Sequence, residues 1–393
     1  MLLKVARIIT GDGETVIEDG AILMEGAIIV GIGTFEELQK KNPGEQVREY
    51  PDGTLMPGFI DMHVHIGSAA NVTDLNDFTR AYLAADYAAK AFGKGVTTIR
   101  DVGSAKNLCA SMVRATQNGT LKLPRIIHTD AAICFTGGHG WQGGVEADGP
   151  WQVRAAIRDA VKRGANWIKI MSSHRSDTPE YTQEELNAAV DECHRVNKKV
   201  AVHAGTQPSI QMAIDAGFDT IEHGTWLTVD QAKQMKEKGM VWVPTIVAYT
   251  FTHQRIVKAM NSSGVSIQES FVQHHAYFRD AAACYHDNFG QLYQAGVEIV
   301  TGTDVVYPGR EVTPVQAEMK FFVEYGMPVI KAIEAATLTG ARTLEMADRF
   351  GEIACGKQAD LQIVKGNPLK EIAAIDDICE VFYAGESVYR CQE

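Results

Sequence analysis

The sequence predicts an α/β fold: a (β/α)8 barrel, or TIM barrel, with a small β-sandwich domain that both ends of the chain build together. Three observations lead to this prediction. Apolar runs alternate with amphipathic helical segments through the middle of the chain, and short β-type runs punctuated by Gly and Asp occupy both ends. The length of 393 residues suits a barrel of roughly 250 residues or more with a modest accessory domain.

Both ends of the sequence show the same pattern of short predicted strands separated by turns. Near the N-terminus, β-type runs at 2–9, 15–17, 21–24 and 27–32 are broken by turn residues such as Gly11 and Gly13. The C-terminal end repeats the pattern at 360–364 and 378–383. We therefore expect residues 1–55 and 352–393 to form one composite β-sandwich domain, with residues 56–351 forming the barrel.

The central region supplies eight candidate strands. Capping-box pairs mark helix starts independently of the strands, as at Thr182 with Glu185 and Thr228 with Gln231. An open doubly wound sheet has the same local pattern and remains an alternative. The stretch 247–297 is mainly helical and too long for one connection, so we expect an extra helix there that covers or shapes the site. The expected strands are 59–65, 97–102, 125–131, 167–171, 200–204, 220–223, 241–246 and 298–303.

Composition and charge exclude several classes of partner. With 37 basic against 49 acidic residues the formal charge is -12, which disfavours binding to nucleic acid and to anionic membranes. The sequence has neither an apolar run of signal-peptide length at its start nor a membrane-length apolar stretch. We expect a cytoplasmic protein that acts on a small molecule. The seven cysteines form no CxxC pair, so a zinc–thiolate site is not expected.

The strongest local motif is the string GFIDMHVH at 58–65. Residues two apart in a strand point the same way, so His63 and His65 should share one face while Met62 and Val64 face the helices. Two imidazoles on a rigid strand can bind one cation at little entropic cost. A HxH pair alone is weak evidence, since such pairs also occur on exposed strands without a ligand.

Three further candidate ligands stand where predicted strands end. His203, His223 and Asp304 are each followed by turn or helix-start residues, which places them on the face where barrel active sites are built. Four imidazoles and a carboxylate make a nitrogen and oxygen site suited to zinc, with manganese, cobalt or nickel as alternatives.

Lys169 is unusual because it lies inside the strand WIKIM, between isoleucines that should point outward. Its amine should therefore point into the barrel. Either it pairs with a carboxylate there, which residue type alone favours, or it loses its proton. A neutral lysine can take up carbon dioxide to become a carbamate, whose two oxygens can bridge two metal ions.

Several motifs together resemble the amidohydrolase superfamily over nearly the whole chain. They are PGFIDMHVH, the strand-end HAG and EHG, TGTD at 301–304, and the tail segment 351–361. The lysine in its I-K-I context resembles binuclear members that act as Xaa-Pro dipeptidases and related carboxypeptidases, whereas imidazolonepropionases and heterocycle deaminases resemble the chain less well. The resemblance implies two divalent cations. The first would be bound by His63, His65 and Asp304 and the second by His203 and His223, with carboxylated Lys169 as the bridge.

The resemblance also implies an activity. A hydroxide shared by the two cations would hydrolyse the amide bond of a dipeptide or an N-acyl amino acid, with catalytic Asp304 carrying the proton to the leaving amine. No G-x-S-x-G motif competes for this role. Relatives suggest a homo-oligomer. The candidate substrate-binding residues are His139, Tyr249, His174 and Arg175; a turn, core or solvent-exposed position without a role is the alternative for each.

Three other functions remain open. The same metals could hydrolyse another amide, such as a urea, a carbamate or a cyclic amide. Deamination of a heterocycle would need one metal and an unmodified Lys169. A barrel that binds without catalysis should lack ligands, and all six candidate positions are filled, which makes this alternative the weakest.

Overall fold

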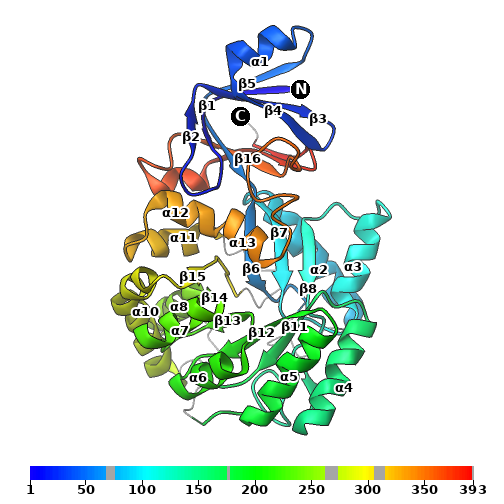
Figure 1. Cartoon of the computed structure of the whole chain (residues 1–393), viewed down its shortest axis with the longest axis vertical. Coiled ribbons are helices and arrows are strands. Elements are labelled where there is room, and N and C mark those ends of the chain that lie inside the picture. Colours follow the sequence, from blue (N-terminus) through cyan, green and yellow to red (C-terminus); the bar gives the residue numbers. More distant parts are fainter. Residues whose placement is uncertain (68–75, 175–177, 262–272, 305–314, 392–393) are drawn as a thin grey trace.

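The computed structural model describes residues 1–67, 76–174, 178–261, 273–304 and 315–391. Strands from both ends of the chain lie together at one end of the molecule, and the βα units fill the rest (Figure 1). The terminal strands are β1 (Leu2–Ile9), β2 (Val16–Glu18), β3 (Gly20–Glu25), β4 (Ile28–Thr34), β5 (Val47–Pro57), β16 (Leu361–Lys365), β17 (Ile378–Tyr383) and β18 (Glu386–Arg390). A short helix, α1 (Phe35–Lys41), follows β4.

These terminal strands form one hydrogen-bonded sheet of eight strands, ordered β18-β17-β16-β5-β1-β3-β4, with β2 paired to β1. Strands from the two ends of the chain thus pair in a single sheet. The central pairing is between β5 and β16, which run antiparallel with Leu55 opposite Ile363. A separate apolar cluster fills this region, with Leu3, Ile22 and Leu361 among its buried members.

The central region alternates parallel strands with helices, as predicted, and its strands form two hydrogen-bonded sheets. One has the order β6-β7-β8 and the other β10-β9-β11-β12-β13-β14-β15. The strands are β6 (Phe59–Val64), β7 (Val96–Asp101), β8 (Arg125–His128), β9 (Ile133–Cys134), β10 (Val145–Glu146), β11 (Trp167–Met171), β12 (Lys199–Ala204), β13 (Thr220–His223), β14 (Val241–Val243) and β15 (Glu298–Ile299). The two sheets are joined through the backbone: Asn166 N donates to His128 O (2.8 Å) and Met62 N donates to Thr301 O (2.9 Å).

Helices flank these strands (Figure 1). They are α2 (Asp77–Phe92), α3 (Leu108–Gln117), α4 (Gly149–Lys162), α5 (Gln183–Arg195), α6 (Gln207–Ala216), α7 (Val229–Lys238), α8 (Ile246–Asn261), α10 (His275–Ala295), α11 (Val315–Glu324), α12 (Val329–Ala335) and α13 (Leu338–Thr343), with a 3-10 turn, η1, at Ile372–Asp376. The capping boxes at Thr182 and Thr228 are formed as predicted. The expected extra helical segment is present as α8 and α10. None of the described helices is long and apolar enough to cross a bilayer.

Several strands end earlier than predicted, among them β8 at His128 and β15 at Ile299, and the physical reason is clearest for β14. The sequence predicted a strand over 241–246, but β14 ends at Val243 and α8 begins at Ile246. Pro244 has no N–H to donate to a neighbouring strand, and Thr245 adopts a positive φ of 54°. The chain therefore turns sharply before the expected end of the strand, and this turn lies beside the site described below.

The two faces of the central strands bury different clusters. Ile168 and Ile170 pack in the large cluster that contains the helices, whereas Trp167 packs in a smaller one with Val243 and Val300. Lys169 shares the face of Trp167, because side chains two apart in a strand point the same way. Each fully buried apolar side chain of this kind contributes about 1.5 to 3 kcal/mol to folding.

The expectation that Met62 faces the helices is wrong. Met62 belongs to the smaller cluster with Trp167, while Val64 packs in the large cluster with the helices. The pairing of β6 with β7 shifts register between Asp61 and Val64. A bulge inserts an extra residue and reverses the alternation beyond it, so Met62 and Val64 fall on opposite faces.

Arg125 links the terminal strands to the βα region. Its guanidinium, mostly buried, donates to Asp360 Oδ2, Thr98 Oγ1 and Gln358 Oε1, each at 2.9 Å, and lies 3.9 Å above the ring of Phe350. Asp360 is buried, so removal of the guanidinium leaves its carboxylate without this partner.

We expect Arg125→Ala to lower the free energy of unfolding by about 2 to 3 kcal/mol, the usual worth of hydrogen bonds to a charged group. Urea denaturation at neutral pH measures the change. Lys90→Ala is the matched control: its pair with Asp86 is exposed, and loss of such a pair costs under about 1 kcal/mol. Equal stability losses in the two variants would contradict a linking role for Arg125.

Candidate metal centre

Three ligand atoms converge at the end of β6. His63 Nε2 and His65 Nε2 are 3.3 Å apart, and each lies 3.4 Å from Asp304 Oδ1. These separations match the edges of a tetrahedron whose centre lies about 2.0 to 2.1 Å from its corners, the usual zinc–ligand distance. The His63 side chain is fully buried, whereas His65 and Asp304 are 15% and 21% exposed. This group could hold a metal ion that remains reachable from solution.

The hydrogen bonds of His63 and His65 select the ring nitrogen that faces this group. His63 Nδ1 donates to Glu222 Oε2 at 2.6 Å, and His65 Nδ1 donates to the carbonyl of Gly103 at 2.7 Å. With Nδ1 protonated, Nε2 carries the lone pair that a metal needs. These two hydrogen bonds thus hold both rings with Nε2 toward Asp304.

Glu222 is itself fixed by a buried ion pair. Arg100 donates to Glu222 Oε1 at 2.7 Å and to the Met62 carbonyl at 2.6 Å, and all three side chains are buried. Burial alone would raise the pKa of Glu222, but the charges of Arg100 and Lys169 lower it below its ordinary range. Glu222 is therefore a carboxylate that orients His63.

Asp61 ties together the two segments that carry ligands. Its Oδ2 accepts from Thr303 Oγ1 at 2.6 Å, and its Oδ1 accepts from the backbone N–H groups of Thr303 and His63. Burial raises the pKa of Asp61 to about 7. The β6 strand and the turn leading to Asp304 are in this way held in register.

His203 lies on β12 and His223 on the neighbouring strand β13, and their rings adjoin this group. Their ring centroids are 4.4 Å apart, and the His223 ring is 4.9 Å from that of His63. Burial lowers the pKa of both imidazoles well below the ordinary value, so both are neutral at pH 7. His223 Nδ1 donates to Thr245 Oγ1 at 2.7 Å, which leaves its Nε2 as the ligand nitrogen.

Lys169 lies among these residues without a hydrogen-bond partner for its buried Nζ. Burial, aided by the charge of Arg100, lowers its pKa to about 8, although Glu222 and Asp304 oppose the shift. The expectation of a direct pair with a carboxylate is not met among the described residues. An unpaired buried amine is costly, and this cost would disappear if the amine carried a carboxylate that binds cations.

Three residues of this cluster hold strained backbone. His223, Thr245 and Asp304 have φ values of 68°, 54° and 51°, in the left-handed region that residues other than glycine rarely adopt. Such strain concentrates at functional sites and needs surrounding contacts to maintain it. For His223 these contacts include Trp242 Nε1, which donates to its carbonyl at 2.7 Å.

The candidate substrate-binding residues are partly brought together. The His139 ring is 4.5 Å from that of His203 and stacks on His174 at 4.7 Å. Tyr249 is buried, with its ring 5.7 Å from that of His223. Arg175 lies outside the described residues.

Five residues that hold the candidate site in place were not predicted from the sequence. They are Asp61, Arg100, Glu222, Thr245 and Glu180, whose carboxylate accepts the His139 N–H at 2.9 Å. A signal existed for two of them: Arg100 and Glu222 are charged residues inside otherwise apolar strand segments, TTIRDV and TIEH. Buried charges of this kind are rarely tolerated unless they are paired.

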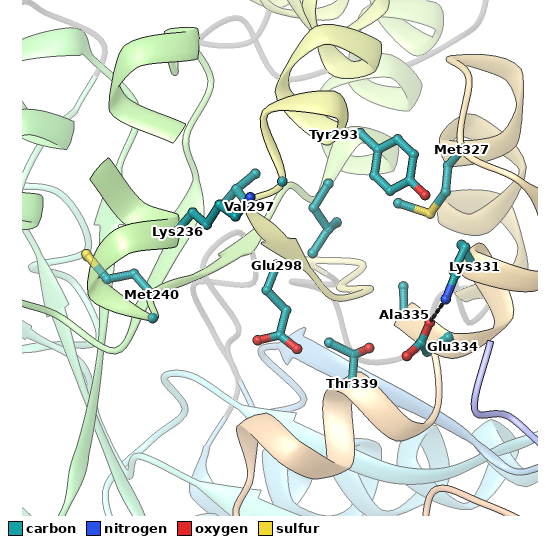
Figure 2. Close-up of a pocket in the computed structure, with 13 residues that line it drawn as sticks. Lys236, Met240, Tyr293, Val297, Glu298, Met327, Lys331, Glu334, Ala335 and Thr339 are labelled. Carbon is teal, nitrogen blue, oxygen red and sulfur yellow. Dashed lines mark hydrogen bonds and ion pairs between the residues drawn. The ribbon is translucent and has the colours of Figure 1, made fainter. Parts of the chain in front are cut away.

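A separate hollow of about 390 Å³ lies near the opposite ends of β14 and β15, where the strands begin. Figure 2 shows its lining, in which Lys331 and Glu334 form an ion pair at 3.0 Å. None of the residues of the metal cluster lines it. The metal cluster is therefore built at the other end of these parallel strands, where they stop.

Comparison with known proteins identifies the family of the chain. The Amidohydrolase family matches residues 54–388. Ochratoxinase from Aspergillus niger is 29% identical over 420 aligned residues, which cover 96% of this chain and 83% of that protein. The crystal structure of a Xaa-Pro dipeptidase with methionine bound in its active site aligns with a TM-score of 0.88 and 32% identity over 99% of both chains. Imidazolonepropionase from Micrococcus luteus is 23% identical over 93% of this chain and 92% of its own.

The family match spans most of the chain and includes every strand that carries a candidate ligand. The resemblance predicted from the sequence is thus confirmed: the chain belongs to the amidohydrolase family.

Proposed function

We propose that the protein is a metal-dependent hydrolase that cleaves the amide bond of a dipeptide or an N-acyl amino acid. The observation that carries the proposal is the approach of His63 Nε2, His65 Nε2 and Asp304 Oδ1 to within 3.4 Å of one another. Family membership supports hydrolysis of a C–N bond. The relatives named Xaa-Pro dipeptidase and ochratoxinase support an amide or peptide substrate.

The residues fit two divalent cations, with zinc as the first choice and manganese, cobalt or nickel as alternatives. His63, His65 and Asp304 would hold one, and His203 with His223 the other. Lys169, carboxylated, would bridge them. The partnerless Nζ of Lys169 supports this role, because the amine has no other use in the described surroundings. When bound, the cations supply an activated water and polarise the scissile carbonyl.

The chain's own side chains orient the substrate and carry the proton. Asp304 Oδ accepts the proton of the attacking water and returns it to the nitrogen of the leaving amine. His139 and Tyr249, beside His203 and His223, would hold the substrate carbonyl and carboxylate, with His174 and Arg175 as further candidates. The buried His63–Glu222 pair keeps the imidazole fixed during the reaction.

A substrate panel and metal analysis test the proposal together. Purified protein should contain two divalent ions per chain and should hydrolyse dipeptides or N-acyl amino acids faster than ureas, carbamates and cyclic amides. Preference for one of the last three would redirect the assignment to another amide at the same metals. A single metal with an unmodified Lys169 and release of ammonia from a heterocycle would replace hydrolysis by deamination.

The pH dependence of metal loading offers a second test. Metal-free protein is supplied with zinc and a constant concentration of dissolved carbon dioxide between pH 6.5 and 9. The Lys169 amine is protonated below its pKa of about 8 and neutral above it, and only the neutral amine takes up carbon dioxide. Recovery of activity should therefore become faster as the pH rises through about 8. His203 and His223 stay neutral over this range, so a rate independent of pH would contradict carboxylation of Lys169.

We also infer finer features of the architecture. Closure of the central strands into a (β/α)8 barrel is supported by the hydrogen bond from Met62 N to Thr301 O. A β-sandwich formed by residues 1–55 and 352–393 is supported by hydrogen bonds from Ile29 N to Lys357 O (2.9 Å) and from Ala359 N to Ala27 O (2.8 Å). These bonds bring β4 against the segment that precedes β16.

We further propose a cellular location, an oligomeric state and a class of partner for the protein. It is a cytoplasmic homo-oligomer that acts on small molecules and binds neither nucleic acid nor membranes, in keeping with its net charge of -12. Size-exclusion chromatography with light scattering measures the oligomeric state.

A further inference from the structure

Glu318 is a buried carboxylate with no assigned use. It lies on α11, its side chain is fully buried, and it forms no ion pair with any residue in the described ranges. Its two oxygens accept the backbone N–H groups of Ile246 (2.9 Å) and Val247 (2.8 Å), the first two residues of α8. An acidic side chain thus caps this helix from another element.

Burying the carboxyl group of Glu318 in this way is energetically unfavourable. Burial raises the pKa of Glu318 to about 8, and the nearby carboxyl of Asp61 adds to the shift, although the backbone N–H groups oppose it. The N-terminus of a helix favours a negative charge and offers N–H groups that need acceptors. A serine, threonine or aspartate directly before the helix would accept hydrogen bonds from these N–H groups at a smaller cost in free energy. The position that would hold such a residue is Thr245, and its hydroxyl is engaged elsewhere.

Thr245 serves His223 instead of its own helix. Its Oγ1 accepts from His223 Nδ1 at 2.7 Å and donates to the carbonyl of Pro244. To reach the imidazole, Thr245 adopts the left-handed φ of 54°, directly before the two residues that Glu318 holds. Glu318 therefore takes over the capping role that Thr245 cannot perform, and it fixes the strained turn from its far side.

The other hydrogen bonds of His223 among the described residues hold its backbone carbonyl, not its imidazole. Trp242 Nε1 and Tyr285 Oη both donate to the His223 carbonyl, at 2.7 and 3.1 Å. Among the described residues, Thr245 is the one hydrogen-bond partner of the imidazole Nδ1. The direction of His223 Nε2 thus depends on the position of the turn at 244–246, and so on Glu318.

We propose that Glu318 is a positioning residue that orients His223, through Thr245, toward the second metal ion. The inference rests on the proposed function, since it assumes that His223 binds a cation. Loss of Glu318 should weaken the site of His203 and His223 and leave the site of His63, His65 and Asp304 intact. A partner behind a metal ligand typically contributes 10- to 100-fold to metal affinity.

The experiment compares zinc binding to metal-free wild type, Glu318→Gln and Glu192→Gln by calorimetry and chelator competition. Glu192 is the matched control: it is also a fully buried carboxylate, but Arg154, Arg158 and Arg195 hold it between α4 and α5. We expect Glu318→Gln to weaken one of the two zinc sites by about 10- to 100-fold, with the other unchanged. Glu192→Gln should leave both affinities unchanged.

Two further variants keep the inference testable if Glu318→Gln does not fold. Glu318→Asp keeps the carboxyl group but withdraws it by one methylene, and it should weaken the same site. Thr245→Val should do likewise, and adding it to Glu318→Gln should cause little further loss, because both act through one turn. A Glu318 variant with a lower melting temperature but wild-type affinity at both zinc sites would overturn the role of Glu318 and leave the proposed function intact. A wild-type protein that binds fewer than two zinc ions would overturn the proposed function together with it.

Discussion

Asp304→Asn is expected to lower kcat/KM by about 100- to 10,000-fold at saturating metal, the range typical of a lost general acid–base group. Asparagine keeps the size of the side chain and an oxygen that can face His63 Nε2 and His65 Nε2, now 3.4 Å away. It cannot accept and return a proton. Burial opposes ionisation of Asp304, but the neighbouring His63 and His65 lower its pKa well below the ordinary value. The wild-type group is therefore a carboxylate at neutral pH, ready to take a proton.

Two measurements make this result interpretable. Metal content shows whether the variant is loaded, and circular dichroism shows whether it is folded. Asp376→Asn is the control, because this half-exposed carboxylate pairs with Lys320 on the surface and should show wild-type kinetics. Near-wild-type turnover of Asp304→Asn with metals bound would remove Asp304 from the proton transfer.

Lys169→Met is expected to separate activity from stability. Its buried Nζ has no hydrogen-bond partner among the described residues, so an apolar side chain of similar length should leave the melting temperature of metal-free protein unchanged or raise it. Turnover should fall by at least about 100-fold, because loss of a direct ligand exceeds the 10- to 100-fold effect of the partners behind ligands. Metal content should fall from two ions per chain to one.

Native mass spectrometry gives an independent readout, since wild type should carry the added mass of one carbon dioxide and Lys169→Met should not. Lys199→Met serves as the control, because Lys199 lies at the start of the next strand, where it pairs with Asp219 at 2.9 Å. Two bound metals and wild-type turnover in Lys169→Met would show that Lys169 has no part in the centre.

The sequence predicted the elements that depend on local pattern. Strand-end histidines were found because an apolar run followed by turn residues fixes where a strand stops, and parallel strands stop on one side. His63, His203 and His223 come together for this reason, with ring centroids 4.4 to 4.9 Å apart along the row. The capping boxes at Thr182 and Thr228 were predicted for the same reason, because each depends on two residues three positions apart in the sequence.

Other features depend on contacts between distant segments and could not be read locally. The bulge that turns Met62 away from the helices arises from how β6 pairs with β7, and a strict period of two misses it. Glu222 points at His63, 159 positions away in sequence. The early end of β14 follows from the left-handed turn at Thr245. This turn places the Thr245 hydroxyl against His223, a contact that the sequence alone does not reveal.

The pairing of β5 with β16 has a consequence for biosynthesis. Leu55 leaves the ribosome long before Ile363, its cross-strand neighbour. Until then β5 presents one unpaired edge, and unpaired edges invite association with other chains. Nascent or prematurely terminated chains should thus depend on chaperones, and a short peptide spanning 361–390 should rescue chains that stop before β16.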